Sequence, residues 1–209
     1  MKVLLLNGSP HEFGCTYTAL REVADTLEQE GIDTEIFHIG TDPVRGCIGC
    51  GSCRKSGVGK CVFDDDRVNQ AIEKAKEADG YFFGSPVHYA SAAGAMSAFL
   101  DRMFYAGGAT MAWKPAAVVL SARRGGTTAA YDQLNKYIGI NNMLQVPCHY
   151  WNMVHGSTPA DVTKDGEGMQ CMRALGRNMA WMLRLLEKGQ ENGLNHPIPE
   201  ERIFTNFIR

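Results

Sequence analysis

The chain has 209 residues and a formal net charge of -2, with 44% hydrophobic and 21% charged residues. These values are ordinary for a soluble globular protein with a substantial core, and they give no reason to expect nucleic acid or an anionic membrane as a partner. The opening run "MKVLLLNGSP" is too short for a signal peptide and no run is long enough to span a membrane, so we expect a cytoplasmic protein.

Apolar strands and amphipathic helices alternate along the chain. The first strand, "VLLL" at 3–6, is continuously apolar, which is typical of a strand buried on both faces of a parallel sheet. The pattern then predicts, in order, a helix over 16–31, a strand over 33–40, a helix over 64–79, a strand over 80–86, a helix over 92–104, a strand over 114–122, a helix over 127–138, a strand over 142–151 and a helix over 169–186.

This order, without internal repeats or linkers, predicts one α/β domain over residues 1–209. Its architecture is a doubly wound sheet of about five parallel strands with helices on both faces. A cysteine-rich loop at 46–61 and a C-terminal tail from about residue 190 lie outside the alternation.

Three strands end in loops of small and polar residues. The loops are "NGSPHEFGCT" at 7–16, "GSPVHYASA" at 84–92 and "SARRGGTT" at 121–128. Because ligands of doubly wound sheets bind beyond the carboxyl ends of the strands, we expect the three loops to meet at one edge. Taken singly, each loop also fits an ordinary turn.

The first loop leads directly into a helix, whose free backbone amides favour an anion. Ser9, Thr16 and Thr18 add hydroxyl donors. The loop has neither the lysine of a GxxxxGK[ST] sequence nor a GxGxxG pattern, which disfavours a nucleoside triphosphate and a dinucleotide. The single phosphate of a mononucleotide fits better.

The other two loops suit a flat aromatic ligand. Residues 86–89 offer apolar and aromatic edges, and Gly125 and Gly126 let backbone amides approach ring carbonyls closely. Burying such a ring contributes roughly 6 kcal/mol, whereas micromolar binding requires about 8 kcal/mol before entropic costs. Ring and phosphate contacts are therefore both needed.

Four of the seven cysteines lie in "GCIGCGSCRKSGVGKC" at 46–61. Cys47, Cys50 and Cys53 stand at three-residue intervals, as the first three cysteines of a bacterial ferredoxin motif do, and Cys61 follows. This compact spacing suits zinc less well, and a reducing cytoplasm disfavours a disulfide. A loop without any metal is a further alternative. The remaining cysteines are isolated in the sequence, and we expect them to be small apolar residues in or near the core: Cys15, Cys148 and Cys171.

Two motifs carry a specific resemblance. "NGSPHEFGCTYTAL" at 7–20 and "GYFFGSPVHYASAAGAMSAFLDR" at 80–102, with the glycine turn after "VVLSA", resemble the flavodoxin-like NAD(P)H-dependent FMN reductase superfamily. "GCIGCGSC…KC" followed by "FDDD" looks most like its iron-sulfur flavoprotein branch and the relatives of that branch that lack the cluster. The likeness extends over nearly the whole chain, including the closing "TNFIR".

The resemblance implies a flavodoxin-like sheet, non-covalently bound FMN and, as a second cofactor, a [4Fe-4S] cluster. It places the FMN phosphate on Ser9, His11, Cys15, Thr16, Tyr17 and Thr18. It places the FMN ring on Pro86, Val87, His88, Tyr89, Ser121, Arg123, Arg124, Gly125 and Gly126. It assigns the cluster to Cys47, Cys50, Cys53 and Cys61. Relatives usually carry arginine at the position of His11 and asparagine at that of Cys15, so this chain departs from the family pattern at two phosphate contacts.

The implied function is that of an FMN-dependent oxidoreductase. It would take hydride from NADH or NADPH and pass electrons to a flavin, a quinone or a nitro compound, or through the cluster. The flavin carries this chemistry, so the sequence identifies no catalytic side chain. Two alternatives are an electron-transfer protein with ferredoxin-like partners and a thiol-based redox sensor. Apolar residues of the last helix, with Trp181, and of the tail "HPIPEERIFTNFIR" predict a homodimer or homotetramer.

Overall fold

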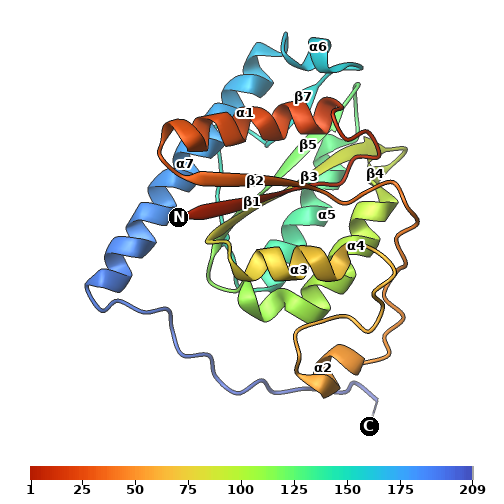
Figure 1. The fold of residues 1–209 in the computed structure, drawn as a ribbon, viewed down its shortest axis with the longest axis vertical. Coiled ribbons are helices and arrows are strands. Elements are labelled where there is room, and N and C mark those ends of the chain that lie inside the picture. Colours follow the sequence, from red (N-terminus) through yellow and green to blue (C-terminus); the bar gives the residue numbers. More distant parts are fainter. Residues whose placement is uncertain (209) are drawn as a thin grey trace.

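A parallel sheet in the order β2-β1-β3-β5-β6 forms the centre of the computed structural model, which describes residues 1–208 (Figure 1). The strands are β1 (Lys2–Asn7), β2 (Asp33–His38), β3 (Gly80–His88), β4 (Ser91–Ala92), β5 (Pro115–Ala122), β6 (Leu144–Gln145) and β7 (Met153–His155). The helices are α1 (Cys15–Gln29), α2 (Ser52–Ser56), α3 (Val68–Lys76), α4 (Gly94–Gly107), α5 (Thr127–Ile140), α6 (Pro159–Val162) and α7 (Gly166–Glu191), with a 3-10 turn η1 (Gly108–Thr110).

The strand order reverses between β1 and β3. The chain moves from β1 to β2 on one side and then returns to pair β3 with the other side of β1, both in parallel. β5 follows on β3, and β6 and β7 both pair with β5. The sheet is therefore flavodoxin-like, as predicted, and the carboxyl ends of β1, β3 and β5 share one edge beside the reversal.

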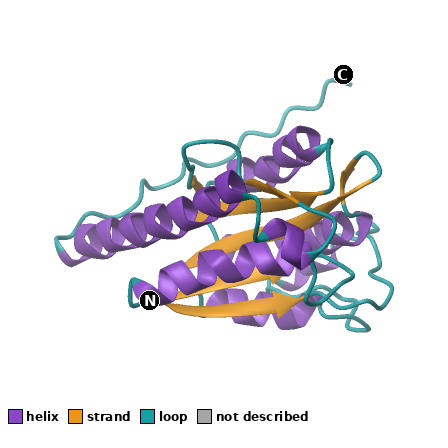
Figure 2. Ribbon diagram, turned by 90° about the horizontal axis from the view of Figure 1, so that it is seen from above, coloured by secondary structure: helices purple, strands orange, loops and turns teal. Residues whose placement is uncertain are grey.

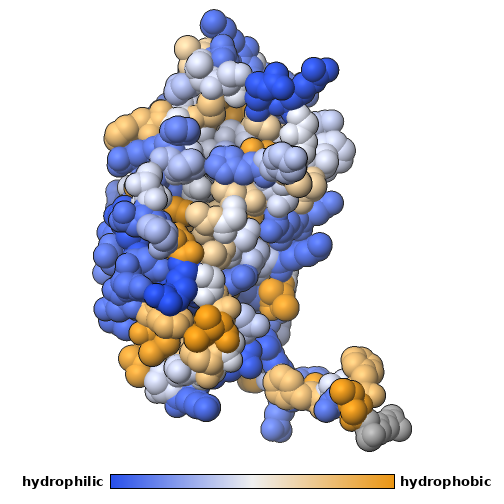
Figure 3. Space-filling view, turned by 90° about the vertical axis from the view of Figure 1, so that its right-hand side faces the viewer, coloured by the Kyte–Doolittle hydropathy of each residue, from blue (hydrophilic) through white to orange (hydrophobic). Residues whose placement is uncertain are grey.

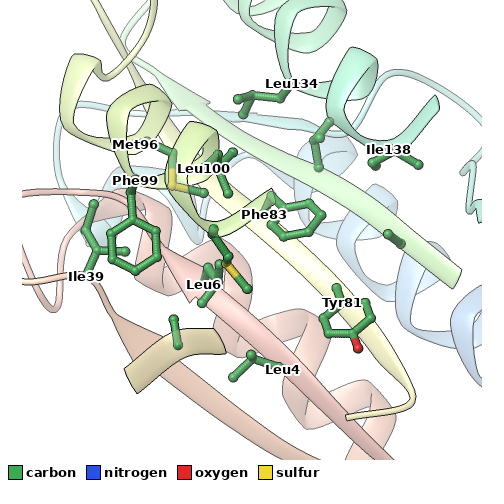
Figure 4. Packing of buried hydrophobic residues seen from close by; sticks show 14 of the residues in the cluster. Leu4, Leu6, Ile39, Tyr81, Phe83, Met96, Phe99, Leu100, Leu134 and Ile138 are labelled. Atoms are coloured by element: carbon green, nitrogen blue, oxygen red, sulfur yellow. The ribbon is translucent and has the colours of Figure 1, made fainter. Parts of the chain in front are cut away.

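Both faces of the sheet are covered by helices (Figure 2). Alternate residues of β1 enter opposite cores, Leu4 and Leu6 with α3, α4 and α5, and Val3 and Leu5 with α1 and α7. This two-sided burial explains the continuous apolar run that predicted the strand. On the α4 side, Leu6 lies among Phe83, Met96, Phe99 and other apolar residues (Figure 4). Each fully buried side chain of this size contributes about 1.5–3 kcal/mol.

The prediction of one strand over 142–151 is wrong in its extent. Two short strands, β6 and β7, occupy the fifth position, and the chain leaves the sheet between them. The break begins at Pro147, which has no amide hydrogen to donate to a neighbouring strand. The next residues turn tightly, with the Cys148 thiol hydrogen-bonded to the backbone of Tyr150.

The helix predicted over 64–79 is shorter than expected. α3 begins at Val68, whose amide donates to Asp66 Oδ1, so only the last aspartate of the run supports the helix start. Asp64 instead accepts a hydrogen bond from Asn69, and Asp65 pairs with Arg45. The cysteine-rich loop contains one feature that the sequence did not predict, the short helix α2.

The last helix is longer than its predicted range, because α7 extends to both sides of 169–186. Asp165 caps its N-terminus by accepting from the amide of Gly168. Beyond α7 the tail has no regular structure, and its apolar side chains are exposed (Figure 3): Ile198, Ile203, Phe204, Phe207 and Ile208. No helix within the described part of the chain combines the length and apolar character needed to cross a membrane.

Candidate functional site

The loop after β1 is held by two buried polar side chains, Asn7 and Ser9. Asn7 Oδ1 accepts from the amide of Ser9 at 3.1 Å, and Asn7 Nδ2 donates to the carbonyl of Glu12 at 2.9 Å. Ser9 Oγ accepts from the amide of His11 at 3.1 Å, and His38 Nε2 lies 2.7 Å from the carbonyl oxygen of Ser9. These contacts fix the loop against the end of β2.

Gly8 lies where this loop passes closest to β3 and α4. Its amide donates to the carbonyl of Gly84 at 2.8 Å. A Cβ atom at Gly8 would lie 2.6 Å from Met96 Sδ and 2.9 Å from the Gly84 oxygen. The backbone approach leaves no space for a side chain, which is why glycine occupies this position.

Three helices that begin at this edge have no side-chain cap. The N-cap residues are Gly14 for α1, Ala93 for α4 and Gly126 for α5, and none of these helices has an acidic residue in its first turn. α1 has 15 residues and α5 has 14, and each presents free first-turn amides and the positive end of its helix dipole at this edge. The edge is therefore suited to an anion such as a phosphate.

Direct contacts join the three loops. Thr16 Oγ1 and Ser121 Oγ lie 2.8 Å apart, and Ser121 stands opposite Pro86 in the register of β3 and β5. Gly126 has a left-handed φ of 95°, and a Cβ atom there would lie 2.8 Å from Val87 Cγ1. The structure thus brings the loops together at the strand-order reversal, as the sequence predicts for a ligand site.

The predicted FMN contacts differ in exposure. Ser9, Thr16 and Ser121 are buried; Cys15, Tyr17, Thr18, Pro86 and Val87 are half-buried; His11, His88, Tyr89, Arg123, Arg124, Gly125 and Gly126 are exposed. Their contact with FMN stays a prediction.

Several of these side chains already have partners within the protein. The Thr18 hydroxyl donates to the carbonyl of Gly14 at 3.1 Å, and the Cys15 thiol donates to the carbonyl of Gly156 at 3.7 Å. Burial is the largest effect on Cys15 and raises the pKa of its thiol. Cys15 therefore lies at the start of α1 as a neutral thiol rather than as a charge that would repel an anion.

Sequence reasoning missed three residues that shape this edge: Asn7, His38 and Ser85. Asn7 belongs to the quoted "NGSP" run, so its place at a strand end was a usable signal. His38 reaches Ser9 only because β1 and β2 pair with Asn7 opposite His38. Ser85 Oγ accepts from the amide of Ala93 at 3.0 Å and so joins β3 to the start of α4.

The four clustered cysteines line a second feature, a hollow of about 170 Å³ beside α2 and α4. We call it the cysteine hollow. Its walls are Cys47, Ile48, Gly49, Cys50, Gly51, Cys53, Arg54, Cys61, Val62, Phe63, Arg102, Tyr105 and Ala106. Cys47 and Cys50 are exposed, whereas Cys53 and Cys61 are half-buried. A hydrogen bond from Ser52 is the main cause that lowers the pKa of the Cys50 thiol.

Cys61 is held firmly on both of its sides. Asn69 on α3 accepts from the Cys61 amide at 2.8 Å and donates to its carbonyl at 3.0 Å. Arg102 on α4 donates from Nε to Cys61 Sγ at 3.2 Å. The thiol therefore has a fixed position at the wall of the hollow.

Arg102 is itself fully buried. Its guanidinium pairs with Asp66 and donates to the carbonyls of Arg45 at 3.2 Å and Phe63 at 3.0 Å. The side chains of Arg102 and Asp66 are only 1% and 4% exposed. Through these contacts the buried guanidinium attaches both ends of the cysteine-rich loop, at Arg45 and at residues 61–66, to α4.

The donor set of the hollow fits an iron-sulfur cluster by its chemistry, because four thiols line one space. Among residues 1–208, no group of three or more His, Cys, Asp or Glu side chains is arranged to hold a metal ion. A cubane cluster distributes its four thiolates over separate iron atoms and so does not need its ligands to converge on one point.

The hollow and the edge of the sheet are separate places joined by α4. The helix begins at Gly94, directly after the hairpin of β3 and β4, and Arg102 lies eight residues further along. At 1.5 Å per residue these positions are about 12 Å apart along the helix axis.

Comparison with known proteins assigns the family. A family model described as NADPH-dependent FMN reductase matches residues 1–158. The chain belongs to this family. Within it, the chain is 32% identical over 203 residues to an iron-sulfur flavoprotein from Methanocaldococcus jannaschii, covering 90% of the chain and 100% of that relative. The family model identifies the chain as a flavin-dependent oxidoreductase, and this relative places it in the iron-sulfur flavoprotein branch.

Solved structures agree with the fold. RosB with a bound 8-demethyl-8-formylriboflavin-5'-phosphate superposes with a TM-score of 0.72 and 14% identity, covering 100% of this chain and 93% of RosB. A flavodoxin from the domain Archaea superposes with a TM-score of 0.59 and 14% identity, covering 88% of this chain and 99% of the flavodoxin. At this identity the two structures support the flavodoxin-like fold alone.

Proposed function

We propose that the chain binds FMN at the edge formed by the three loops and takes hydride from NADH or NADPH. Electrons then pass to a small acceptor such as a flavin, a quinone or a nitro compound, or through an iron-sulfur cluster. The observation that carries the proposal is the meeting of the loops after β1, β3 and β5 at the strand-order reversal, with open helix N-termini beside them.

The phosphate would bind at the start of α1. The free amides of the first turn and the hydroxyls of Ser9 and Thr16 supply donors there, while His11 is exposed beside them. Since the Thr18 hydroxyl donates to the carbonyl of Gly14, it can donate to a phosphate oxygen only by leaving that bond. The phosphate would meet fewer charged side chains here than in relatives that carry arginine at position 11. The backbone amides of α1 therefore supply most of the phosphate binding.

The ring would lie against residues 86–89 and the turn at 123–126. FMN supplies the two-electron chemistry when it is bound. The protein orients it: Pro86 and Val87 offer apolar contact, and the exposed amides at Gly125 and Gly126 can donate to ring oxygens. Tyr89, with a left-handed φ of 59°, projects into solvent at the tip of the β3–β4 hairpin and borders the face that a nicotinamide or an acceptor would approach.

A spectroscopic titration tests the FMN proposal. Protein freed of flavin is titrated with FMN, and we expect quenching of flavin fluorescence with a Kd in the micromolar range or below. Riboflavin serves as the matched ligand without phosphate and should bind at least tenfold more weakly. Equal affinity for the two ligands would contradict phosphate binding at α1, and no binding of either would overturn the assignment.

We propose that the cysteine hollow holds a [4Fe-4S] cluster through Cys47, Cys50, Cys53 and Cys61. The support is the lining of one space by all four thiols. Iron and acid-labile sulfide are measured in anaerobically purified protein, with Cys61→Ser as the test variant and Cys15→Ser as the control outside the hollow. We expect loss of iron in Cys61→Ser only. Iron-free wild-type protein would contradict the proposal.

A second candidate function is electron transfer without substrate turnover, with a ferredoxin-like partner. The cysteine hollow favours it, because a one-electron centre beside a two-electron flavin can split electron pairs. Stopped-flow mixing of the holoprotein with NADPH or NADH separates the two functions. Bleaching of the flavin within milliseconds to seconds supports the reductase, whereas no bleaching supports the carrier. A thiol-based sensor would instead change its activity upon thiol oxidation alone.

We also propose that the chain forms a homodimer or homotetramer. The apolar residues of the tail are exposed in the single chain (Figure 3). Trp181 on α7 is exposed as well. Analytical ultracentrifugation of the full chain should give a mass of two or four chains. A monomer would contradict this proposal.

A further inference from the structure

The connection between β6 and β7 runs along α7. Asn178 Nδ2 on α7 donates to the carbonyl of Pro147 at 2.7 Å, and His149 Nε2 lies 3.6 Å from Cys171 Sγ, also on α7. Cys148 stands between these two contacts in the sequence. The structure therefore brings together two of the cysteines that are isolated in the sequence.

The two thiols are neighbours, since Cys148 contributes to the raised pKa of Cys171. Cys171 is buried in the core between the sheet and α7, whereas Cys148 is half-buried at its border. Burial, followed by the neighbouring Cys148, raises the pKa of the Cys171 thiol, so that Cys171 stays protonated. The Cys148 thiol donates to the carbonyl of Tyr150 at 2.8 Å and accepts from the Tyr150 amide at 3.4 Å.

We propose that Cys148 and Cys171 are a redox-active dithiol that hydrogen peroxide converts into a reversible disulfide. His149 serves as the proton acceptor for Cys171. The partly exposed Cys148 is the thiol that peroxide reaches, and the buried Cys171 resolves the product. This site uses none of the residues assigned to FMN and none of those that line the cysteine hollow.

The chemistry balances in two steps. The Cys148 sulfur attacks one peroxide oxygen, the O–O bond breaks, and the thiol proton leaves with the other oxygen as water, which yields a sulfenic acid. The Cys171 sulfur then attacks the Cys148 sulfur, and the S–O bond breaks. The departing hydroxide takes the Cys171 proton, relayed through His149 Nε2, and leaves as a second water. Two thiols lose two electrons to one peroxide, and a thiol reductant such as dithiothreitol reverses the result.

The other cysteine on this side of the sheet lacks such an arrangement. Cys15 Sγ donates to the carbonyl of Gly156, and burial is the main cause that raises the pKa of its thiol. Within residues 1–208, only the pair at 148 and 171 joins a partly exposed thiol to a buried thiol with an imidazole nitrogen beside it. Cys15 is therefore the matched control within the same chain.

Peptide mapping of the full-length protein tests the proposal. The protein is treated with a few equivalents of hydrogen peroxide, alkylated without reduction and digested with trypsin. We expect the peptides Tyr137–Lys164 and Asp165–Arg173, each with one cysteine, to appear as a linked pair that lacks two hydrogen atoms and disappears on reduction. Cys15 should remain alkylated in the same digest.

Variants identify the roles of the three residues. Cys171→Ala should leave Cys148 as a sulfenic acid that dimedone labels. His149→Gln should slow linkage at least tenfold without slowing the first oxidation of Cys148, so dimedone labelling of Cys148 should rise. Cys15→Ser should form the linked pair as the wild type does. The proposal is overturned if Cys148 pairs with another cysteine, if it proceeds to sulfinic acid in the wild type, or if both thiols remain alkylated. An unaltered linkage rate in His149→Gln would overturn the role of His149.

Discussion

Replacing Arg102 by methionine tests the buried ion pair that fixes Cys61 at the cysteine hollow. Methionine keeps much of the length and apolar contact of the arginine stem but removes the guanidinium. The variant leaves the Asp66 carboxylate, 4% exposed, without its cation, and it leaves Cys61 Sγ without the Nε donor. Two carbonyls lose their donors as well, those of Arg45 and Phe63.

Removing one partner from a buried ion pair destabilises a protein by about 3–5 kcal/mol. A domain has a free energy of unfolding of about 5–15 kcal/mol in total, so the loss is a large fraction of it. At roughly 2–4 °C per kcal/mol for a chain of this size, we expect Tm to fall by roughly 10 °C. Urea unfolding of flavin-free protein, followed by circular dichroism, measures the free energy without a contribution from ligand binding.

Two further variants show whether the pair itself is responsible. Arg184→Met removes an exposed pair with Glu30 and should lose at most about 1 kcal/mol. Arg102→Met combined with Asp66→Asn should recover part of the stability, because no uncompensated charge remains while the amide oxygen can still accept from the start of α3. The reasoning is refuted if Arg102→Met is no less stable than Arg184→Met, or if the double variant is less stable than the single one.

Gly126→Ala places a Cβ atom 2.8 Å from Val87 at a left-handed φ, so it should weaken FMN binding at least tenfold in the fluorescence titration. Gly139→Ala, at the far end of α5 with open space around it, should bind FMN as the wild type does, and equal affinities of the two variants would contradict the assigned turn. Asn69→Ala frees the backbone of Cys61 and should lower the iron content of anaerobically purified protein, which an unchanged iron-to-protein ratio would disprove. Arg21 and then Thr34 lower the pKa of Glu28 below 4.5, so the Arg21–Glu28 pair stabilises the fold fully above pH 4.5 and loses its effect as the pH falls through the lower pKa of the folded state. The difference in unfolding free energy between wild type and Glu28→Gln is at most about 1 kcal/mol and should shrink from pH 6 to pH 3. A difference that grows would contradict the pairing.

Periodicity predicted the fold because most elements bury a regular face. The run of residues 3–6 indicated two-sided burial, and β1 has that burial. The fifth strand was mispredicted because an apolar run does not reveal where the backbone leaves a sheet. Pro147 was the available signal, but the turn after it depends on contacts of Cys148 and Asn178 with distant parts of the chain.

The site was predictable to the extent that its residues follow strand ends. All three loops were identified from "NGSP", "GSP" and "RRGG", because parallel strands place their carboxyl ends together. The contact of His38 with Ser9 and the guanidinium behind Cys61 were beyond the sequence. Each depends on register or on helix packing between residues separated by 29 and 41 positions. The nearness of Cys148 to Cys171 was missed for the same reason.

The rigidity of α4 limits how the chain can tolerate length changes. Adding one residue between Gly94 and Arg102 would turn everything after it by about 100° about the helix axis, which would swing the guanidinium away from Asp66 and Cys61. Insertions here would have to come in approximate whole turns, and each would increase the distance between the edge of the sheet and the cysteine hollow. The length of α4 thus sets the distance between the proposed FMN site and the proposed cluster site.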